Sequence, residues 1–396
     1  MTPPPSAQKS PPRSKPWSWR SRAFRGLVYQ FVAIVVIALV AWFLASNTLY
    51  NMRVRGIQSG FDFLSQPAGF SIGESLFPFD SAESYWRAFG VGLANTLRVA
   101  VVGIVFSTLL GTLLGVGRFS RNALVRGLCA AYVECFRNIP VLLQLLMWYL
   151  VLTEVFPPIQ DAWKVGPFFL SKGGVNFPVP VWQAGQAWAA TGLGAGVVLA
   201  WAWRAGARKR FEATGVPRSM FWLPLAIGLA AGVLGWALGG APTEMDMPVK
   251  GEFAVENGGA LTPEFLAILL GLSIYTAAFI AEVVRAGIAS VAAGQGEAAS
   301  ALGLSKGLEI RLVVLPQALR VIIPPMTNQY LNLTKNSSLA VAIGYPDIVS
   351  IANTAMNQTG RAVECIAILM AVYLSLSLLT SVLMNWYNAR SAIKER

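Results

Sequence analysis

The sequence contains no histidine and only three cysteines among its 396 residues. Without histidine, Ser–His and Cys–His catalysis and every metal site that uses imidazole are excluded. The cysteines, Cys129, Cys135 and Cys365, are scattered along the chain, and no pair has the spacing of metal ligands. We therefore predict buried free thiols, no metal site and no catalytic residue.

Charged residues are also scarce, because Asp, Glu, Lys and Arg make up only 13% of the chain, whereas 55% of it is hydrophobic. A soluble domain carries about 25% charged residues, so water is not the main solvent of this protein. Basic residues outnumber acidic ones by 31 to 19, which gives a formal net charge of +12. Membrane proteins gather Lys and Arg at their cytoplasmic faces, and no aromatic and basic platform accompanies the charge, so we expect no nucleic-acid partner.

Long apolar stretches are what the chain has in quantity. A helix needs about 20 apolar residues to cross the hydrocarbon core of a bilayer. About eight stretches are long enough or nearly so, and the fourth, fifth and eighth of them contain no charged residue. The sequence therefore predicts an all-α integral membrane protein in a lipid bilayer, with spans at residues 27–48, 90–117, 138–156, 181–203, 219–240, 264–286, 317–339 and 365–388.

The charges between these spans predict the orientation. Residues 1–26 form a proline-rich arm with basic residues and no acid, and the apolar stretch after the arm ends in no evident cleavage site. We therefore predict an uncleaved first helix behind a basic arm. The segments after the second, fourth and eighth spans are basic, and two of the alternate loops are acidic or mixed. The positive-inside rule then places both termini in the cytoplasm.

One connector, residues 294–316, differs from an ordinary loop. It reads Glu297-Ala298-Ala299, three residues, Gly303, nine residues, and Val313-Val314-Leu315-Pro316. An acid such as Glu297 favours a helix N-terminus, the alanines favour the helix itself, and Gly303 can adopt the left-handed conformation that ends it. Ser305 can cap a second helix, and Pro316 would mark the end of that helix. The pattern predicts a short helix pair that projects into the cytoplasm and docks in a groove of another protein.

This segment resembles the EAA loop of ABC importer permeases, whose pattern is E-A-A, three residues, G, nine residues and I-x-L-P. Val313 stands where isoleucine is usual, and an ordinary amphipathic connector is the alternative interpretation. The resemblance implies that the loop inserts into a nucleotide-binding subunit and transmits ATP-driven closure to the membrane helices. The coupling residues would be Glu297, Ala298, Ala299, Gly303, Leu315 and Pro316.

Three further segments are similar to the polar amino-acid uptake branch of these permeases, the histidine, glutamate, glutamine, arginine and opine type. These segments are residues 281–287, 132–140 and 336–339. The resemblance covers about 90–156 and 263–390, which would form a five-helix core. The chain departs from it by an extra first helix and loop at 27–89, a two-helix insertion at 157–262 and a tail at 391–396. That arrangement resembles the general L-amino-acid permeases, in particular the subunit that pairs with a different permease chain.

The resemblance implies the type I ABC importer fold in a bacterial inner membrane, with transport of amino acids by alternating access. The chain has no G-x-x-x-x-G-K-[ST] loop, so no cofactor is expected on it, and ATP and Mg would bind a partner ATPase. The implied partners are two copies of that ATP-binding subunit, a second permease subunit and a periplasmic amino-acid-binding protein. An ion-coupled secondary transporter or channel is the alternative, and a membrane-embedded enzyme is a weaker one.

The stretch 317–339 is the most polar of the spans. Pro324-Pro325 predicts a break in its helix. We hypothesise that its later polar residues contact a zwitterionic solute, with Lys335 nearest the carboxylate, since broken helices and ionisable residues frame transporter sites. The alternatives are a polar clasp between helices, or a Lys335 side chain that snorkels outward. The proposed pathway residues are Asn328, Asn332, Lys335, Asn336, Ser337 and Ser338.

Other residues of the predicted spans have no assigned function. Glu282 and Arg285, like Glu134 and Arg137, could form gate or interface ion pairs or be ordinary helix-end charges. Arg98 lies about two turns into the second span and has no evident partner. Glycines four residues apart allow close helix contacts in lipid, although chance also accounts for them in a chain with 37 glycines: Gly111–Gly115, Gly228–Gly232 and Gly235–Gly239.

Overall fold

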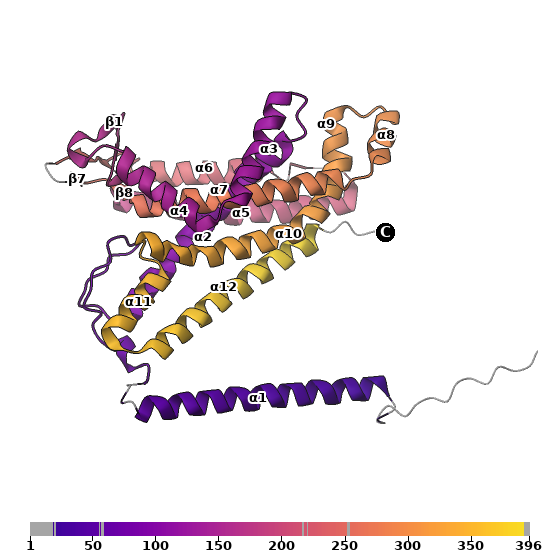
Figure 1. The fold of residues 1–396 in the computed structure, drawn as a ribbon. Coiled ribbons are helices and arrows are strands. Elements are labelled where there is room, and N and C mark those ends of the chain that lie inside the picture. Colours follow the sequence, from indigo (N-terminus) through magenta and orange to yellow (C-terminus); the bar gives the residue numbers. More distant parts are fainter. Residues whose placement is uncertain are drawn as a thin grey trace, which may run out of the picture.

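The computed structural model describes residues 19, 21–54, 56, 59–215, 218–219, 221–251 and 254–391. Most of the predicted arm, and all but the first residue of the predicted tail 391–396, lie outside the described residues. The described chain is mainly helical (Figure 1). Its longer helices are α1 (Arg22–Val54), α2 (Tyr85–Gly117), α3 (Ala123–Asn138), α4 (Val141–Leu150), α5 (Ala184–Thr214), α6 (Trp222–Leu238), α7 (Pro263–Ala289), α10 (Leu315–Asn336), α11 (Ile348–Thr359) and α12 (Ala362–Ser391).

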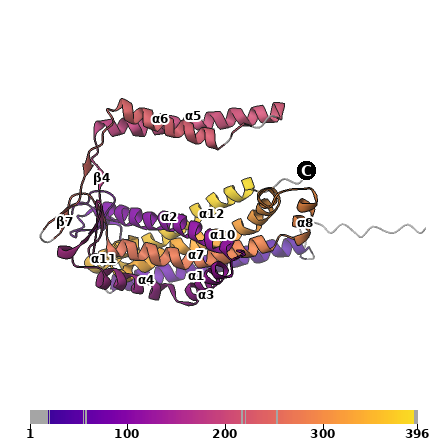
Figure 2. The same ribbon diagram turned by 90° about the horizontal axis from the view of Figure 1, so that it is seen from above.

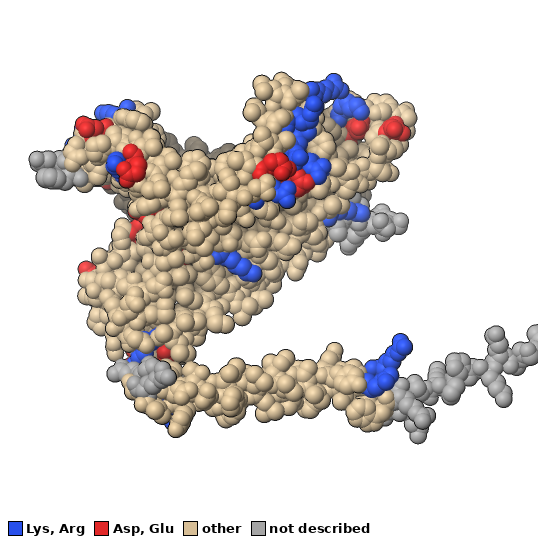
Figure 3. Space-filling model, in the orientation of Figure 1, with Lys and Arg blue, Asp and Glu red and all other residues tan. Residues whose placement is uncertain are grey.

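Four described helices are long and apolar enough to cross a membrane, namely α1, α2, α7 and α12. The pair α3–α4 makes a fifth span if it counts as one, but it is bent by 104°. The bend lies at Ile139, whose backbone is extended because Pro140 follows it. The third predicted span, residues 138–156, begins at this bend, and each of the eight predicted stretches falls on a helix. Figure 3 shows the surface of the molecule in the orientation of Figure 1. Charged side chains gather toward the two ends of this surface, and an almost uncharged belt lies between them.

The core is built around α7, which packs against α2, α3, α4 and α10. The predicted contact of Gly111 and Gly115 is confirmed, because α2 lies directly on α7 at these positions. A Cβ atom at Gly111 would stand 2.6 Å from Ile280, and one at Gly115 would stand 2.7 Å from the carbonyl oxygen of Ala281. Small residues thus let the two backbones approach as closely as they do.

Helices α5 and α6 form a hairpin that packs on itself. Figure 2 shows the hairpin lying apart from the other helices and joined to them at its strand end. Its helices meet at glycines, since a Cβ atom at Gly192 would stand 2.4 Å from the Ala231 oxygen and one at Gly235 would stand 2.3 Å from the Trp188 oxygen. The contact predicted from the glycines of residues 228–239 is therefore confirmed, with α5 as the partner.

The segments that flank this hairpin contain short strands, which the all-α expectation missed. A four-stranded antiparallel sheet has the order β1-β2-β3-β8, and β4–β5 and β6–β7 form two small ribbons. Gly166, with φ of +61°, lies in the turn between β1 and β2, a conformation that glycine adopts readily. Runs of two to four residues are too short to give a period-two pattern in the sequence. The strands are β1 (Trp163–Val165), β2 (Phe168–Ser171), β3 (Gly174–Phe177), β4 (Val179–Pro180), β5 (Met245–Asp246), β6 (Val249–Lys250), β7 (Val255–Glu256) and β8 (Gly259–Leu261).

Residues 59–84, here called the cap segment, connect α1 to the core and contain the short 3-10 helix η1 (Asp62–Ser65). Phe63 is 1% exposed and packs in a cluster with residues of α2, α11 and α12. The buried Arg361 donates to the Gly60 oxygen at 3.2 Å and to the Asp62 carboxylate at 3.1 Å. Glu364 accepts from the Gly60 amide at 2.6 Å. These contacts fix the cap segment on the strand end of the core.

Candidate functional site

Residues 294–316, called the EAA loop here after the sequence Glu297-Ala298-Ala299, form a helical hairpin. It projects from the ends of α7 and α10, at the opposite end of the molecule from the strands (Figure 1). It contains α8 (Ala293–Ala301), α9 (Lys306–Glu309) and the π-helical turn η4 (Ile310–Val314). Gly303 has φ of +76°, so the predicted left-handed end of the first helix is confirmed. Ser305 precedes α9, but its side chain makes no capping hydrogen bond.

Two details of the predicted hairpin are wrong. Helix α8 begins at Ala293, so Glu297 lies in its middle and not at its N-terminus. The second helix does not end at Pro316, because η4 leads directly into α10. Pro316 is the second residue of α10 and follows the π-helical turn η4 directly. The EAA loop is therefore continuous with the α10 helix.

The side chains of the EAA loop are mostly exposed. Glu297, Ala298 and Gly303 are exposed, Ala299 is buried, and Leu315 and Pro316 are exposed and half-buried respectively. The described tip also carries an apolar side chain, Leu302, which is 81% exposed.

The predicted break at Pro324-Pro325 is wrong, because α10 runs through both prolines. Packing holds this part of the helix, since Ile322, Ile323 and Met326 are buried beside the prolines. The helical path changes further along, where the 3-10 helix η5 (Ser337–Ile343) follows α10. Sterics at proline disfavour a helix without forbidding it, and tertiary contacts decide the outcome here.

The predicted pathway residues divide into two groups. Asn328, Asn332 and Lys335 are exposed on α10, and Asn336 is half-buried. The hydroxyl groups of Ser337 and Ser338, by contrast, donate to backbone oxygens one turn back, Thr334 at 2.7 Å and Lys335 at 2.8 Å. The serines therefore stabilise the start of η5, whereas Asn328, Asn332 and Lys335 expose their polar groups on the surface of α10.

A cleft runs along the contact of α7 and α10 and consists of two adjoining hollows that share Phe279 and Gln329. The first hollow has a volume of about 320 Å³. The second has about 280 Å³ and is lined in part by Arg137 and Glu282. Of the predicted pathway residues, only Asn332 and Asn336 line this α7–α10 cleft. The lining of the first hollow is Tyr275, Thr276, Phe279, Gln329, Asn332 and Asn336.

A cluster of charges stands at the end of the cleft nearer the EAA loop, and Figure 3 shows acidic and basic side chains gathered beside α3. Glu282 of α7 accepts from Arg118, which follows α2, at 2.5 Å and from Arg285 at 3.0 Å. The guanidinium carbon of Arg137 lies 5.3 Å from the centre of the Phe279 ring. The Glu282 and Arg118 pair links two core helices and is thus more than a helix-end charge.

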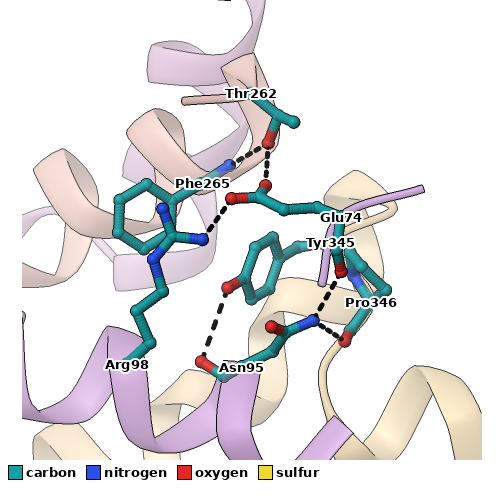
Figure 4. A network of polar contacts seen from close by, with 7 residues as sticks. All are labelled: Glu74, Asn95, Arg98, Thr262, Phe265, Tyr345 and Pro346. Atoms are coloured by element: carbon teal, nitrogen blue, oxygen red, sulfur yellow. Dashed lines mark hydrogen bonds and ion pairs between the residues drawn. The ribbon is translucent and has the colours of Figure 1, made fainter. Parts of the chain in front are cut away.

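A second polar network lies at the strand end of the core and gives Arg98 its partner (Figure 4). The Arg98 guanidinium forms an ion pair with Glu74 of the cap segment and lies 3.9 Å from the centre of the Phe265 ring. The Thr262 hydroxyl donates to the other Glu74 oxygen and accepts from the Phe265 amide at 3.1 Å. Glu74 thus joins the cap segment to α2 and to the start of α7. Because Glu74 is only 9% exposed, these contacts lie in a site of low solvent access.

Asn95 extends this network to the segment that precedes α11 (Figure 4). Its amide nitrogen donates to the Glu74 backbone oxygen at 2.8 Å and to the Pro346 oxygen at 2.9 Å. The hydroxyl of the buried Tyr345 donates to the backbone oxygen of Asn95 at 3.4 Å. A cavity of about 440 Å³ lies next to Glu74 and Thr262. The strand end is therefore held by directed polar contacts.

Sequence reasoning missed several cleft residues and misjudged the thiols. Thr276, Phe279 and Gln329 line the cleft but were not predicted, although Thr276 is a polar residue inside an apolar span. Among the cysteines only Cys365 is buried, whereas Cys135 is exposed on α3. No group of three or more Cys, Asp or Glu residues that could hold a metal occurs in the part of the chain that the structure describes.

Comparison with known proteins places the chain among transport proteins. The "General L-amino acid transport system permease protein AapQ" of Rhizobium johnstonii is 46% identical over 387 residues, which is 96% of each chain. The "Glutamate/glutamine/aspartate/asparagine transport system permease protein BztB" of Rhodobacter capsulatus is 38% identical over 406 residues, 94% of this chain and 95% of that protein. Residues 107–392 match the family described as "Binding-protein-dependent transport system inner membrane component". The chain belongs to this family of permease subunits.

Proposed function

We propose that the chain is the membrane-spanning permease subunit of an ABC importer and translocates amino acids by alternating access. The family match over residues 107–392 is the observation that carries the proposal, since the family is one of binding-protein-dependent transport components. The similar permeases are named for general L-amino acids and for acidic amino acids and their amides. Polar or general L-amino acids are therefore the proposed cargo, and an ion-coupled transporter is not favoured.

The EAA loop is the proposed docking site for the ATPase. It projects from the helical body and presents several exposed apolar side chains, among them Leu302 at 81% and Ile310 at 56% exposure. A groove in a partner subunit would cover these side chains. ATP and Mg belong to that partner, of which two copies serve one pair of permease subunits. Glu297, Ala298, Ala299 and Gly303 shape the docked helix, and Leu315 and Pro316 connect it to α10.

The polar face of α10 supports a translocation path between two permease subunits. Asn328, Asn332 and Lys335 are exposed along α10, which crosses the membrane in this proposal. Such side chains are costly in contact with lipid tails and require a protein partner or water. A second permease subunit, in our proposal a different homologous chain, covers this face, and the α7–α10 cleft opens into the space between the two subunits.

The proposed placement is a bacterial inner membrane, with about eight spans, the type I importer fold and both termini in the cytoplasm. The EAA loop then faces the cytoplasm, and the cap segment and the strands face the periplasm, where a soluble amino-acid-binding protein docks. Residues 90–156 and 263–390 form the working core. Residues 157–262 form a separate module added to it.

The test uses the complete transporter, reconstituted in liposomes with its ATPase, its second permease and its binding protein. Leu302→Asp places a charge at the proposed docking surface, so it should prevent co-purification of the ATPase and abolish ATP-driven uptake of amino acids. Leu76→Asp is the matched control for co-purification of the ATPase alone, because Leu76 is 49% exposed but lies in the cap segment, on the proposed binding-protein side. Wild-type uptake in the Leu302→Asp complex would contradict the docking role. Uptake by the permease without any ATPase would favour the ion-coupled alternative.

A further inference from the structure

Glu309 closes the EAA hairpin from the inside. It is the last residue of α9, and although its side chain is charged it is only 8% exposed. Its carboxylate accepts from the Lys306 amine at 2.9 Å and from the Ser300 hydroxyl at 3.2 Å. These two hydrogen bonds, with that from Lys306 the larger cause, hold the pKa of Glu309 below its ordinary value. The carboxylate is therefore ionised at neutral pH and bonded across the hairpin to α8.

The opposing surface of α8 leaves room for this carboxylate. A Cβ atom at Gly296 would stand 3.0 Å from the nearer Glu309 oxygen, tighter than most real contacts. A glycine in the middle of a helix weakens it by about 1 kcal/mol relative to alanine. The close approach of the Glu309 carboxylate supplies a physical reason for glycine at position 296.

Helix α10 follows Glu309 closely, so the contact between Glu309 and α8 also links α8 to α10. Residues of η4 begin directly after Glu309 and lead into α10 without an intervening loop. Gln317 of α10 adds a second, longer link, since its amide nitrogen lies 3.4 Å from the side-chain oxygen of Gln295 on α8. The turn at Gly303 is exposed and short, so side-chain bonds between α8 and the α9–α10 helix resist the opening of the hairpin.

We infer that Glu309 is a positioning residue that locks the docking helix α8 to the base of α10, so that a push on α8 moves α10 as one body. Glu309 lies between the Gly303 and Leu315-Pro316 positions of the EAA pattern and is not part of that pattern. The inference rests on the proposed function, because it concerns how ATPase motion reaches the translocation path. Ser300 makes the bond that crosses the hairpin, because it lies on α8. Lys306 lies on α9 with Glu309, and its side chain is 72% exposed, so that pair adds only local support.

The experiment measures ATP hydrolysis and amino-acid uptake together in the reconstituted complete transporter. Glu309→Ala should leave ATPase co-purification intact but lower the ratio of uptake to ATP hydrolysed about tenfold, the factor expected from the loss of one hydrogen bond to a charged group. Ser300→Ala should lower the same ratio by a smaller factor. Glu212→Gln is the matched control, since Glu212 is 62% exposed on α5 and should leave the ratio unchanged.

The outcomes separate the lock from the proposed function. If the wild-type complex shows no ATP-dependent uptake, the proposed function fails and the lock has no process to act in. If the wild type works and both Glu309→Ala and Ser300→Ala keep its ratio, the lock is overturned. Loss of ATPase co-purification in Glu309→Ala also overturns it, because the residue would then act in docking. Should Glu309→Ala fail to fold, Ser300→Ala and Gly296→Ala decide, and an unchanged ratio in both of them overturns the inference.

Discussion

The core and the α5–α6 hairpin use the same kind of helix contact, but the two are embedded differently. In both, glycines bring backbones so close that an added Cβ atom would stand within 3 Å of the partner helix. In the core, α7 is surrounded by four further helices, whereas α5 and α6 lie apart from the core helices (Figure 2). Glycine spacing therefore reports that two helices touch, but it does not report whether they belong to the working part of the protein.

Ion pairs distinguish the two regions more clearly. The core pairs Arg98–Glu74 and Arg118–Glu282 join different elements, and their side chains are at most 27% exposed. An ion pair of the hairpin, Arg208–Glu212, lies within one turn of α5, and its side chains are 78% and 62% exposed. Partly buried pairs between elements fix relative positions, whereas an exposed pair within one helix does little beyond local support.

The largest expected effect comes from separating the helices in each region. Gly115→Leu should abolish assembly and uptake, because a side chain there would collide with Ala281 and force α2 away from α7. Gly192→Leu should open the hairpin against Ala231 but leave ATP-driven uptake in place. Size-exclusion chromatography and uptake of the reconstituted complex measure both. If Gly192→Leu stops uptake as completely as Gly115→Leu, the hairpin belongs to the translocation machinery and the comparison breaks.

A smaller effect is expected from breaking the polar network in Figure 4. Arg98→Met leaves the nearly buried Glu74 charge without its cation and should lower the free energy of unfolding by about 3–5 kcal/mol. Arg98→Met combined with Glu74→Gln should recover much of that loss, because no uncompensated charge remains. Thermal unfolding in detergent measures the difference. The control Arg208→Met in the hairpin should change it by less than about 0.5 kcal/mol, and an equal loss in both would contradict the distinction.

Sequence reasoning found what depends on local pattern and missed what depends on the fold. Apolar runs of sufficient length located most of the long helices but missed α3 and α11, and Gly303 located the turn of the EAA hairpin. The partner of Arg98 was not predictable, because Glu74 reaches it only after the cap segment folds onto the core. The continuity of α10 through Pro324-Pro325 was also missed, since packing on neighbouring helices outweighs the local cost of proline. The cleft is a property of two packed helices and has no signature on either one alone.

Replacement of Lys335 should have the smallest effect on stability. Its effect on transport should nevertheless be large. This side chain is exposed on α10 and makes no ion pair within the described residues, so Lys335→Met should leave assembly and thermal unfolding unchanged. Uptake should fall about tenfold or more if the amine contacts the solute carboxylate, because a hydrogen bond to a charged group is worth about 1.5–3 kcal/mol. Lys209→Met, at a lysine that is also exposed but lies on α5, is the hairpin control and should have no effect on uptake. Unchanged uptake in Lys335→Met would mean that the amine snorkels away from the path, and a parallel loss of assembly would mean that it clasps a neighbouring subunit. The contrast between the two lysines thus tests whether exposed polarity in the core, unlike that in the hairpin, serves transport.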